Sequence, residues 1–153
     1  MVPRPGLTPY RRRVLALDDL CRTVVMVRAG ASLFTDEGRK QWWGKCEKCS
    51  KLGWLQWSHY YSRAIHAVRW DLDNSCSMCK GCHFSFSHGA HQKRVIEWWE
   101  KRLGPERARA LELRAGRGSR RPDPMAIELY LRAALAHQGV ADEACTRPTK
   151  VPR

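Results

Sequence analysis

Apolar residues recur every three to four positions in several stretches of the chain, which is the spacing of an amphipathic helix. The first stretch lies between Asp18, an N-cap residue type, and Gly30, a C-cap type, and predicts a helix of about ten residues. Three further helices are predicted in the C-terminal half, over 95–103, 106–114 and 126–136. Trp98 and Trp99 are predicted to pack in the core rather than to stack on nucleic-acid bases, because an amphipathic stripe usually faces a core.

Strand patterns are shorter. Leu55–His59 alternates apolar and polar residues and predicts a strand that ends in a histidine. The stretch Ala67–Trp70 is predicted to supply its antiparallel partner. Residues 31–45 give mixed signals, with a pair of tryptophans as the only strong apolar feature, and are predicted to form a loop or a short helix.

These elements and the segments around them divide the chain into four parts. Residues 1–13 hold three prolines and four arginines and predict a basic extended arm. Residues 14–116 are predicted to form one folded domain, since a chain of 153 residues is too short for two sizeable cores. Residues 117–124 read as a basic, turn-rich linker, and residues 125–153 as a C-terminal helix with a disordered tail.

The chain is strongly basic. It carries 28 Lys and Arg against 15 Asp and Glu, a formal net charge of +13. A polyanion relieves self-repulsion of this size, so nucleic acid is the predicted partner, with a solvated basic surface that binds nothing specific as the alternative. The apolar runs are too short to span a membrane, and the first residues lack the apolar core of a signal peptide, which predicts a cytoplasmic protein.

Seven cysteines in a reducing compartment favour metal binding over disulfides. Cys46-x2-Cys49 and Cys79-x2-Cys82 have the spacing of zinc knuckles, and together they supply the four thiolates of a closed tetrahedral site, so Zn2+ is the predicted structural ion. Cys76 offers a pair that overlaps the second knuckle, and a different choice of ligands stays open. The cysteines left over are predicted to be small apolar fillers or exposed thiols, namely Cys21, Cys76 and Cys145.

Three further residues follow in the order His59, Asn74 and His83. The stretches that carry them are Leu55-Gln-Trp-Ser-His59, Val68-Arg-Trp-Asp-x2-Asn74 and Cys79-x2-Cys82-His83. This pattern resembles the HNH, or ββα-metal, nuclease family in its four-cysteine zinc form, and within it the phage NinG (Rap) recombination endonucleases and related phage HNH proteins. The helical run Glu97-Trp-Trp-x3-Leu-Gly104 is similar to the helix that follows in those proteins. The resemblance covers roughly residues 14–115 and is most specific over 46–83.

The resemblance implies an α+β fold in which a small zinc-stapled ββα-metal (His-Me finger) core is flanked by N-terminal and C-terminal helices. It implies a metal-dependent endonuclease that cuts DNA, with branched recombination intermediates such as Holliday junctions as substrates, and with a homodimer or phage DNA-processing proteins as partners. His59 takes the place of the general base that activates water. Asn74 takes the place of an asparagine that braces the loop or touches the metal. His83 sits where the family has a ligand of the catalytic Mg2+ or Mn2+.

One position departs from the family pattern. The residue before the general base is often Asp or His and helps to bind the metal, whereas here it is Ser58, whose hydroxyl is a poor ligand for Mg2+ or Mn2+. His88 and His91 are the nearest replacements in the sequence, with Asp71 and Asp73 behind them. The second ligand of the catalytic metal therefore stays open.

Elementary chemistry supports the same roles. An imidazole with an ordinary pKa of about 6.5 can take a proton from water near neutral pH, as phosphodiester hydrolysis requires. A divalent ion held by His83 and a second side chain supplies positive charge to the phosphate oxygens. The structural zinc ties the strand before His59 to the turn before His83, which brings base and metal ligand together without a large core.

Arginines supply the predicted DNA contacts. Arg63 and Arg69 flank the loop between the two histidines and suit phosphate oxygens. Basic runs extend this footprint and consist of Arg11, Arg12, Arg13, Arg120 and Arg121. Contacts of this kind are largely independent of sequence, so selectivity is expected for DNA shape. The alternative is that Arg63 and Arg69 only solvate a loop.

Each proposed role has a structural alternative. His59 could be a hydrogen-bonded strand histidine, Asn74 a turn residue and His83 a zinc ligand in place of a cysteine. The remaining histidines are predicted to be surface residues more readily than ligands, namely His66, His88, His91 and His137. Two other functions stay open: a catalytically inactive, zinc-dependent nucleic-acid-binding module, and a DNA-packaging accessory protein that uses the apolar face of the last helix.

Overall fold

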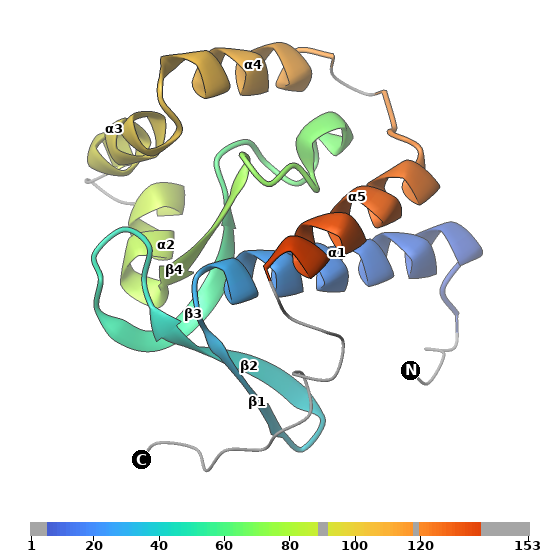
Figure 1. Cartoon of the computed structure of the whole chain (residues 1–153), viewed down its shortest axis with the longest axis horizontal. Coiled ribbons are helices and arrows are strands. Elements are labelled where there is room, and N and C mark those ends of the chain that lie inside the picture. Colours follow the sequence, from blue (N-terminus) through green and yellow to red (C-terminus); the bar gives the residue numbers. More distant parts are fainter. Residues whose placement is uncertain (1–5, 89–91, 118–119, 139–153) are drawn as a thin grey trace.

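Five α-helices and a four-stranded antiparallel sheet make up the part of the chain that the computed structural model describes, residues 6–88, 92–117 and 120–138 (Figure 1). The predicted α+β class is confirmed. The predicted tail and residues 1–5 of the predicted arm lie outside the described residues, as do the side chains of residues 87 and 88. None of the described helices is long and apolar enough to cross a membrane.

The first helix, α1, spans Pro9–Arg28 and so begins well before Asp18, where its apolar pattern predicted a start. The Thr8 side chain caps it by accepting a hydrogen bond from the Arg11 amide at 3.2 Å, and Pro9 suits the first turn because its missing N–H would have no partner there. The predicted extended arm is therefore wrong over residues 9–13, which are helical. The buried residues of α1 include Val14, Leu17, Cys21, Val24 and Val25.

Residues 31–45, predicted as a loop or short helix, instead form a β-hairpin of β1 (Ser32–Asp36) and β2 (Arg39–Lys45). Glu37 and Gly38 make the two-residue turn with φ angles of 45° and 77°, as a type I′ turn requires. The prediction failed because Glu-Gly is a weaker turn signal than Asn-Gly. In addition, each strand buries a single residue, so no alternation is visible in the sequence.

The strand predicted to end in His59 is confirmed as β3, which spans Leu52–His59. Its predicted partner, Ala67–Trp70, is wrong: that stretch contains a short 3-10 helix, η1 (His66–Val68). The true partner is β4 (Ser75–Cys79), paired from Leu55↔Cys79 to His59↔Ser75. The start of β4, Ser-Cys-Ser-Met, does alternate polar and apolar residues, but it contains no β-branched or aromatic side chain that would mark a strand, and all four residues are buried.

The two middle strands of the sheet separate along their length. The pairing of β2 with β3 begins at Lys45↔Leu52 and ends at Trp42↔Leu55. Beyond that point β2 pairs only with β1, and the last residues of β3, from Gln56 to His59, pair only with β4. The sheet therefore opens between β2 and β3 next to His59.

Of the remaining four helices, one packs on the sheet, one packs on α1, and the other two pack on neighbouring helices (Figure 1). They are α2 (Lys80–His88), α3 (Gln92–Leu103), α4 (Pro105–Ala115) and α5 (Pro124–His137). Helix α2 packs on β3 and β4, and α5 packs along α1. The three predicted C-terminal helices are confirmed, and the last begins within the predicted linker, at Pro124. Trp99 is fully buried, as predicted, and shares a core with Met26, Met78, Leu111 and Leu131.

Candidate metal centre and adjoining cleft

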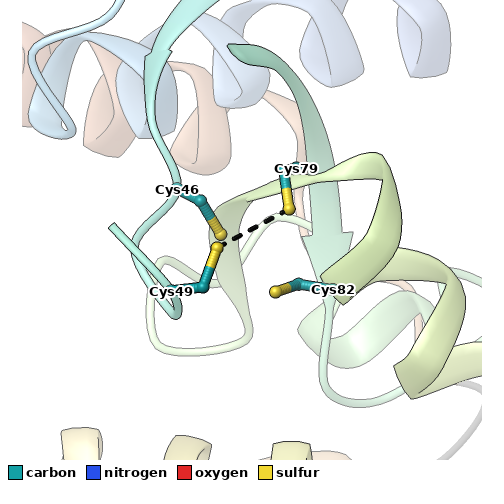
Figure 2. A group of neighbouring side chains, drawn as sticks. All are labelled: Cys46, Cys49, Cys79 and Cys82. Carbon is teal, nitrogen blue, oxygen red and sulfur yellow. Dashed lines mark hydrogen bonds between the residues drawn. The ribbon is translucent and has the colours of Figure 1, made fainter. Parts of the chain in front are cut away.

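Four cysteine sulfurs converge at one end of the sheet, as Figure 2 shows. Cys46 and Cys49 lie in the turn after β2, Cys79 ends β4 and Cys82 lies in the first turn of α2. All four Sγ atoms lie within 4.8 Å of one another, and those of Cys49 and Cys79 are 3.8 Å apart. A tetrahedral zinc ion with bonds of about 2.3 Å to sulfur sets its sulfurs about 3.8 Å apart. The four residues predicted from their spacing therefore fit a metal ion such as zinc.

The sequence left open whether Cys76 or His83 replaces one of the four cysteines as a ligand of the structural ion, and the grouping of the sulfurs bears on this choice. Cys76 and His83 do not belong to the group of potential ligands found among the described residues. Cys76 is fully buried in β4, and burial raises the pKa of its thiol well above the ordinary value. Cys21 is also fully buried, which raises its thiol pKa to about 12. Both are core fillers, as predicted, whereas Cys145 lies outside the described residues.

Glu47, inside the first knuckle, fixes the metal centre to three other elements. Its amide donates to the Ser77 carbonyl of β4 at 3.0 Å, and its carboxylate accepts from the Ser77 hydroxyl at 3.0 Å. The same carboxylate pairs with Arg102 of α3 at 3.0 Å and with Arg28 of α1 at 3.5 Å. Sequence reasoning missed this residue, because only the fold brings its two arginines together.

His59 ends β3 with its ring held on two sides. Its Nε2 lies 3.2 Å from the Arg69 carbonyl oxygen, and its ring centroid lies 4.2 Å from that of Trp57. Burial, and after it the charge of Arg63, lower the pKa of His59 to about 4. The ring is therefore neutral at pH 7. A carbonyl oxygen only accepts, so Nε2 carries the ring proton and Nδ1 keeps the lone pair.

Asn74 is fully buried just before β4 and holds the loop that follows His59. Its Oδ1 accepts from the Tyr61 amide at 2.7 Å, and its Nδ2 donates to the carbonyls of Tyr61 at 3.1 Å and Val68 at 2.9 Å. Of the two roles left open, bracing the loop is the one these contacts perform. The side chain is a positioning group and contacts neither His59 nor His83 among these hydrogen bonds.

His83 lies on α2, one residue after Cys82 of the four-cysteine group. Its Nδ1 lies 2.7 Å from the Ser58 hydroxyl, which fixes the plane of the ring. Two histidines were suggested as replacements for the ligand missing at Ser58, and one of them, His88, was also predicted as a tentative metal ligand. His91 and the side chain of His88 both lie outside the described residues.

The other suggested replacements are committed elsewhere. Asp71 pairs with Arg114 at 2.6 Å, and Asp73 pairs with both Arg107 and Arg114. These ion pairs attach α4 to the segment before β4, and neither aspartate lines the cleft that contains His83. The suggestion that Asp71 or Asp73 serves as the second metal ligand is therefore wrong for this arrangement.

A cleft of about 900 Å³ opens where β2 and β3 separate. His59 and His83 both line it, the first from the end of β3 and the second from α2. The other lining residues include three cations and several aromatic rings, and no carboxylate is among the described residues around it. These cations and rings are Arg22, Lys40, Arg63, Trp42, Trp54, Trp57, Tyr60 and Phe86. Its charge suits an anionic ligand.

The predicted DNA-binding arginines have different surroundings. Arg63 is exposed and lines the cleft. Arg69 is mostly buried, and two of its nitrogens donate hydrogen bonds to Asp18 at 2.9 Å and 2.7 Å. Its guanidinium therefore holds the structure together and is not available for the predicted contact with phosphate.

The basic run 11–13 lies in the first turns of α1. Arg12 donates to the Leu7 carbonyl at 2.9 Å, and Arg13 pairs with Glu128 of α5 at 3.2 Å. Arg12 is about 15 Å along the helix axis from Arg22, at a rise of about 1.5 Å per residue. The arginine of α1 that lines the cleft is Arg22, which the sequence analysis did not single out. The basic run Arg11, Arg12 and Arg13 does not line it.

Comparison with known proteins adds no relative: no family model, no curated protein and no solved structure matches the chain.

Proposed function

We propose that the protein is a metal-dependent endonuclease that hydrolyses DNA phosphodiester bonds, with β3, β4 and α2 as a ββα-metal core. The observation that carries this proposal is the shared cleft, where the imidazoles of His59 and His83 meet three cations. Support also comes from the order strand, loop, strand and helix, with His59 at the end of the first strand and His83 on the helix. This is the order that the HNH resemblance implies.

In the proposed reaction His59 is the general base. Its Nδ1 takes a proton from a water molecule as the water oxygen attacks phosphorus. The bond between phosphorus and the 3′ oxygen breaks, and that oxygen takes up a proton, which leaves a 5′-phosphate and a 3′-hydroxyl. The Arg69 carbonyl orients the ring, and the low pKa keeps it neutral before substrate binds. A bound phosphate anion then raises this pKa and strengthens the base.

A divalent ion at His83 would supply positive charge to the phosphate oxygens. Apart from His59, His83 is the one Cys, His, Asp or Glu among the described residues that line the cleft. Besides His59, the described lining residues would therefore offer an ion one imidazole and no carboxylate, and neutral oxygens of side chains, water and phosphate would have to supply the other ligands. Imidazole favours later transition metals over Mg2+.

The second candidate function is a zinc-dependent nucleic-acid-binding module without catalysis. Ser58 favours it, because this buried hydroxyl stands where the family often has a metal ligand and none of the described residues that line the cleft carries a carboxylate. Such a module would keep the basic cleft and bind DNA with a strong dependence on salt.

The two functions are separated by incubating zinc-loaded protein with linear duplex, single-stranded and four-way-junction DNA in Mg2+, Mn2+, Co2+ or Ni2+. The endonuclease proposal expects cleavage only with an added divalent ion, with the junction cut fastest and with 5′-phosphate ends. Salt-sensitive binding without cleavage in every ion would instead establish the binding module.

A further inference from the structure

Two arginines from distant segments stack on one indole. The guanidinium carbons of Arg22, in α1, and Arg63, in the loop after β3, lie 5.7 Å and 5.9 Å from the centroid of the Trp57 ring. Trp57 also contacts the ring of His59, with the centroids 4.2 Å apart. All four side chains line the cleft. Two cations therefore lie beside the group proposed as the general base.

Neither guanidinium forms an ion pair with a carboxylate among the described residues. Asp18 and Asp19 precede Arg22 by four and three positions, a spacing at which helical side chains can pair. Asp18 is instead bound to Arg69, and Asp19 to Lys40. Both guanidinium groups therefore lack a neutralising carboxylate among the described residues, and an anion bound in the cleft would supply the missing negative charge.

The indole itself supplies an independent observation. Trp57 is only 9% exposed, and its Nε1 is buried without a hydrogen-bond partner. A buried donor without an acceptor is costly, and such groups are few in folded proteins. An anion oxygen beside the two guanidinium groups is an acceptor of the kind this N–H lacks.

We propose that Arg22, Arg63 and the Trp57 indole N–H form a phosphate-binding site at the His59 end of the cleft, and that its ligand is a phosphate of a nucleic-acid backbone. Guanidinium groups suit this ligand because their planar N–H donors pair with phosphate oxygens two at a time. The role of the site in holding DNA for cleavage rests on the proposed endonuclease function, whereas anion binding does not. The site adds α1 to the elements that contact substrate.

Binding is measured with zinc-loaded protein and no added Mg2+ or transition metal, so that no cleavage occurs. A fluorescent single-stranded oligodeoxynucleotide is the probe, and Arg22→Gln and Arg63→Gln are the variants. Arg109→Gln is the matched control, because it removes one charge from a side chain on α4 that is 70% exposed and does not line the cleft. Thermal unfolding of each variant checks that the fold is retained.

Each cleft variant is expected to bind the oligonucleotide about 5- to 20-fold more weakly than wild type, and Arg109→Gln within about twofold. The double variant should lose less than the product of the two single losses, because both arginines hold one phosphate. Equal affinities for wild type, Arg22→Gln, Arg63→Gln and Arg109→Gln would overturn the proposal.

The indole N–H is followed by NMR during titration with the oligonucleotide and, separately, with inorganic phosphate. The Trp57 Nε1–H signal is expected to move with both. A signal that moves with inorganic phosphate alone would overturn the assignment to a nucleic-acid backbone.

The outcomes for binding and for cleavage are distinct. Weaker binding by Arg22→Gln and Arg63→Gln, in a protein that never cuts DNA, would support the anion site and remove the endonuclease proposal. A wild-type protein that cuts DNA, with both variants binding and cutting as Arg109→Gln does, would keep the endonuclease proposal and remove the anion site.

Discussion

The hydroxyl of Ser58 lies 2.7 Å from Nδ1 of His83, although 25 positions separate the two residues. Ser58 is fully buried in β3 and His83 is on α2, so this contact joins strand to helix and fixes the imidazole beside the cleft. The HNH resemblance expects an acidic or imidazole ligand where Ser58 stands. In the proposed endonuclease, a hydroxyl at this position bears directly on which ion His83 would bind.

The first prediction concerns that ion. Because His83 offers an imidazole and the cleft has no carboxylate among its described lining residues, Mn2+, Co2+ and Ni2+ should support the proposed cleavage at concentrations at least about tenfold below Mg2+. Initial cleavage rates measured against the concentration of each ion test this. A lower half-saturating concentration for Mg2+ than for the transition metals would contradict it.

The second prediction concerns the four-cysteine centre. Removal of zinc should lower the free energy of unfolding by at least about 4 kcal/mol, the effect expected of a ligand present at about 1,000 times its Kd. Protein purified with its metal should contain one zinc per chain, with sulfur ligands at about 2.3 Å by X-ray absorption. Cys79→Ser should lose most of the bound zinc, because Cys79 is one of the four grouped sulfurs.

Cys145→Ser is the control for that substitution, since Cys145 belongs to neither Cys-x2-Cys pair of the sequence. It should retain one zinc per chain and the wild-type unfolding curve. Full zinc content in Cys79→Ser, measured by atomic absorption, would show that the ligand set is wrong.

The third prediction follows from the low pKa of His59. Its pKa is about 4 in the folded protein, where burial and Arg63 disfavour the charged ring, and about 6.5 in the unfolded chain. Between these two pKa values the unfolded chain binds a proton that the folded protein does not, so the free energy of unfolding rises with pH across this window. Above about pH 6.5 the ring is neutral in both states and the rise is complete. Its full size is on the order of 3 kcal/mol.

Urea unfolding at several pH values between 4 and 7 measures that contribution. His59→Gln keeps a side-chain donor for the Arg69 carbonyl but has no proton to gain, so its stability should change less over this range than that of wild type. Identical pH dependence in the two proteins would show that His59 titrates alike in the folded and unfolded states.

The fourth prediction separates two arginines that the sequence treats alike. Arg69 is mostly buried against Asp18, and removal of one partner of a buried pair leaves the other charge unpaired. Arg69→Gln should therefore lower the unfolding free energy by about 3–5 kcal/mol. Arg63 is exposed and forms no ion pair with any described carboxylate, so Arg63→Gln should change stability by less than about 0.5 kcal/mol.

Chemical denaturation of both variants at pH 7 provides the comparison. Equal stability losses would mean that the pairing of Arg69 with Asp18 does not hold the loop in place. In that event Arg69 would again be a candidate for contact with DNA.

The sequence predicts the elements whose signals are local. The C-terminal helices have helical apolar spacing, and the four grouped cysteines have fixed short spacing, so both could be recognised without tertiary information. The hairpin of β1 and β2 and the buried strand β4 could not, because the hairpin strands lack a regular alternation, β4 has no β-branched or aromatic residue, and all three become strands only through pairing. The early start of α1 had a local signal in Thr8 and Pro9 that the apolar pattern outweighed.

The candidate site divides in the same way. His59 and His83 could be identified from the sequence because His59 ends a strand pattern and His83 directly follows a Cys-x2-Cys pair. The contributions of Arg22 and Trp57 depend on α1 crossing the open end of the sheet, and no spacing in the sequence records that contact. Asp18 and Arg69 are 51 positions apart, so the sequence does not show their ion pair. Arg69 was predicted to contact DNA, but in the fold it has a structural role.

The central claim is that His59 acts as a base on DNA held in the cleft, and single-turnover cleavage by His59→Gln tests it most directly. The reaction is run with saturating transition-metal ion on the DNA that wild type cuts fastest, after oligonucleotide binding and zinc content are shown to equal those of wild type. The account predicts a rate lower by at least about 100-fold, the usual contribution of a general base. A rate equal to that of wild type would contradict it.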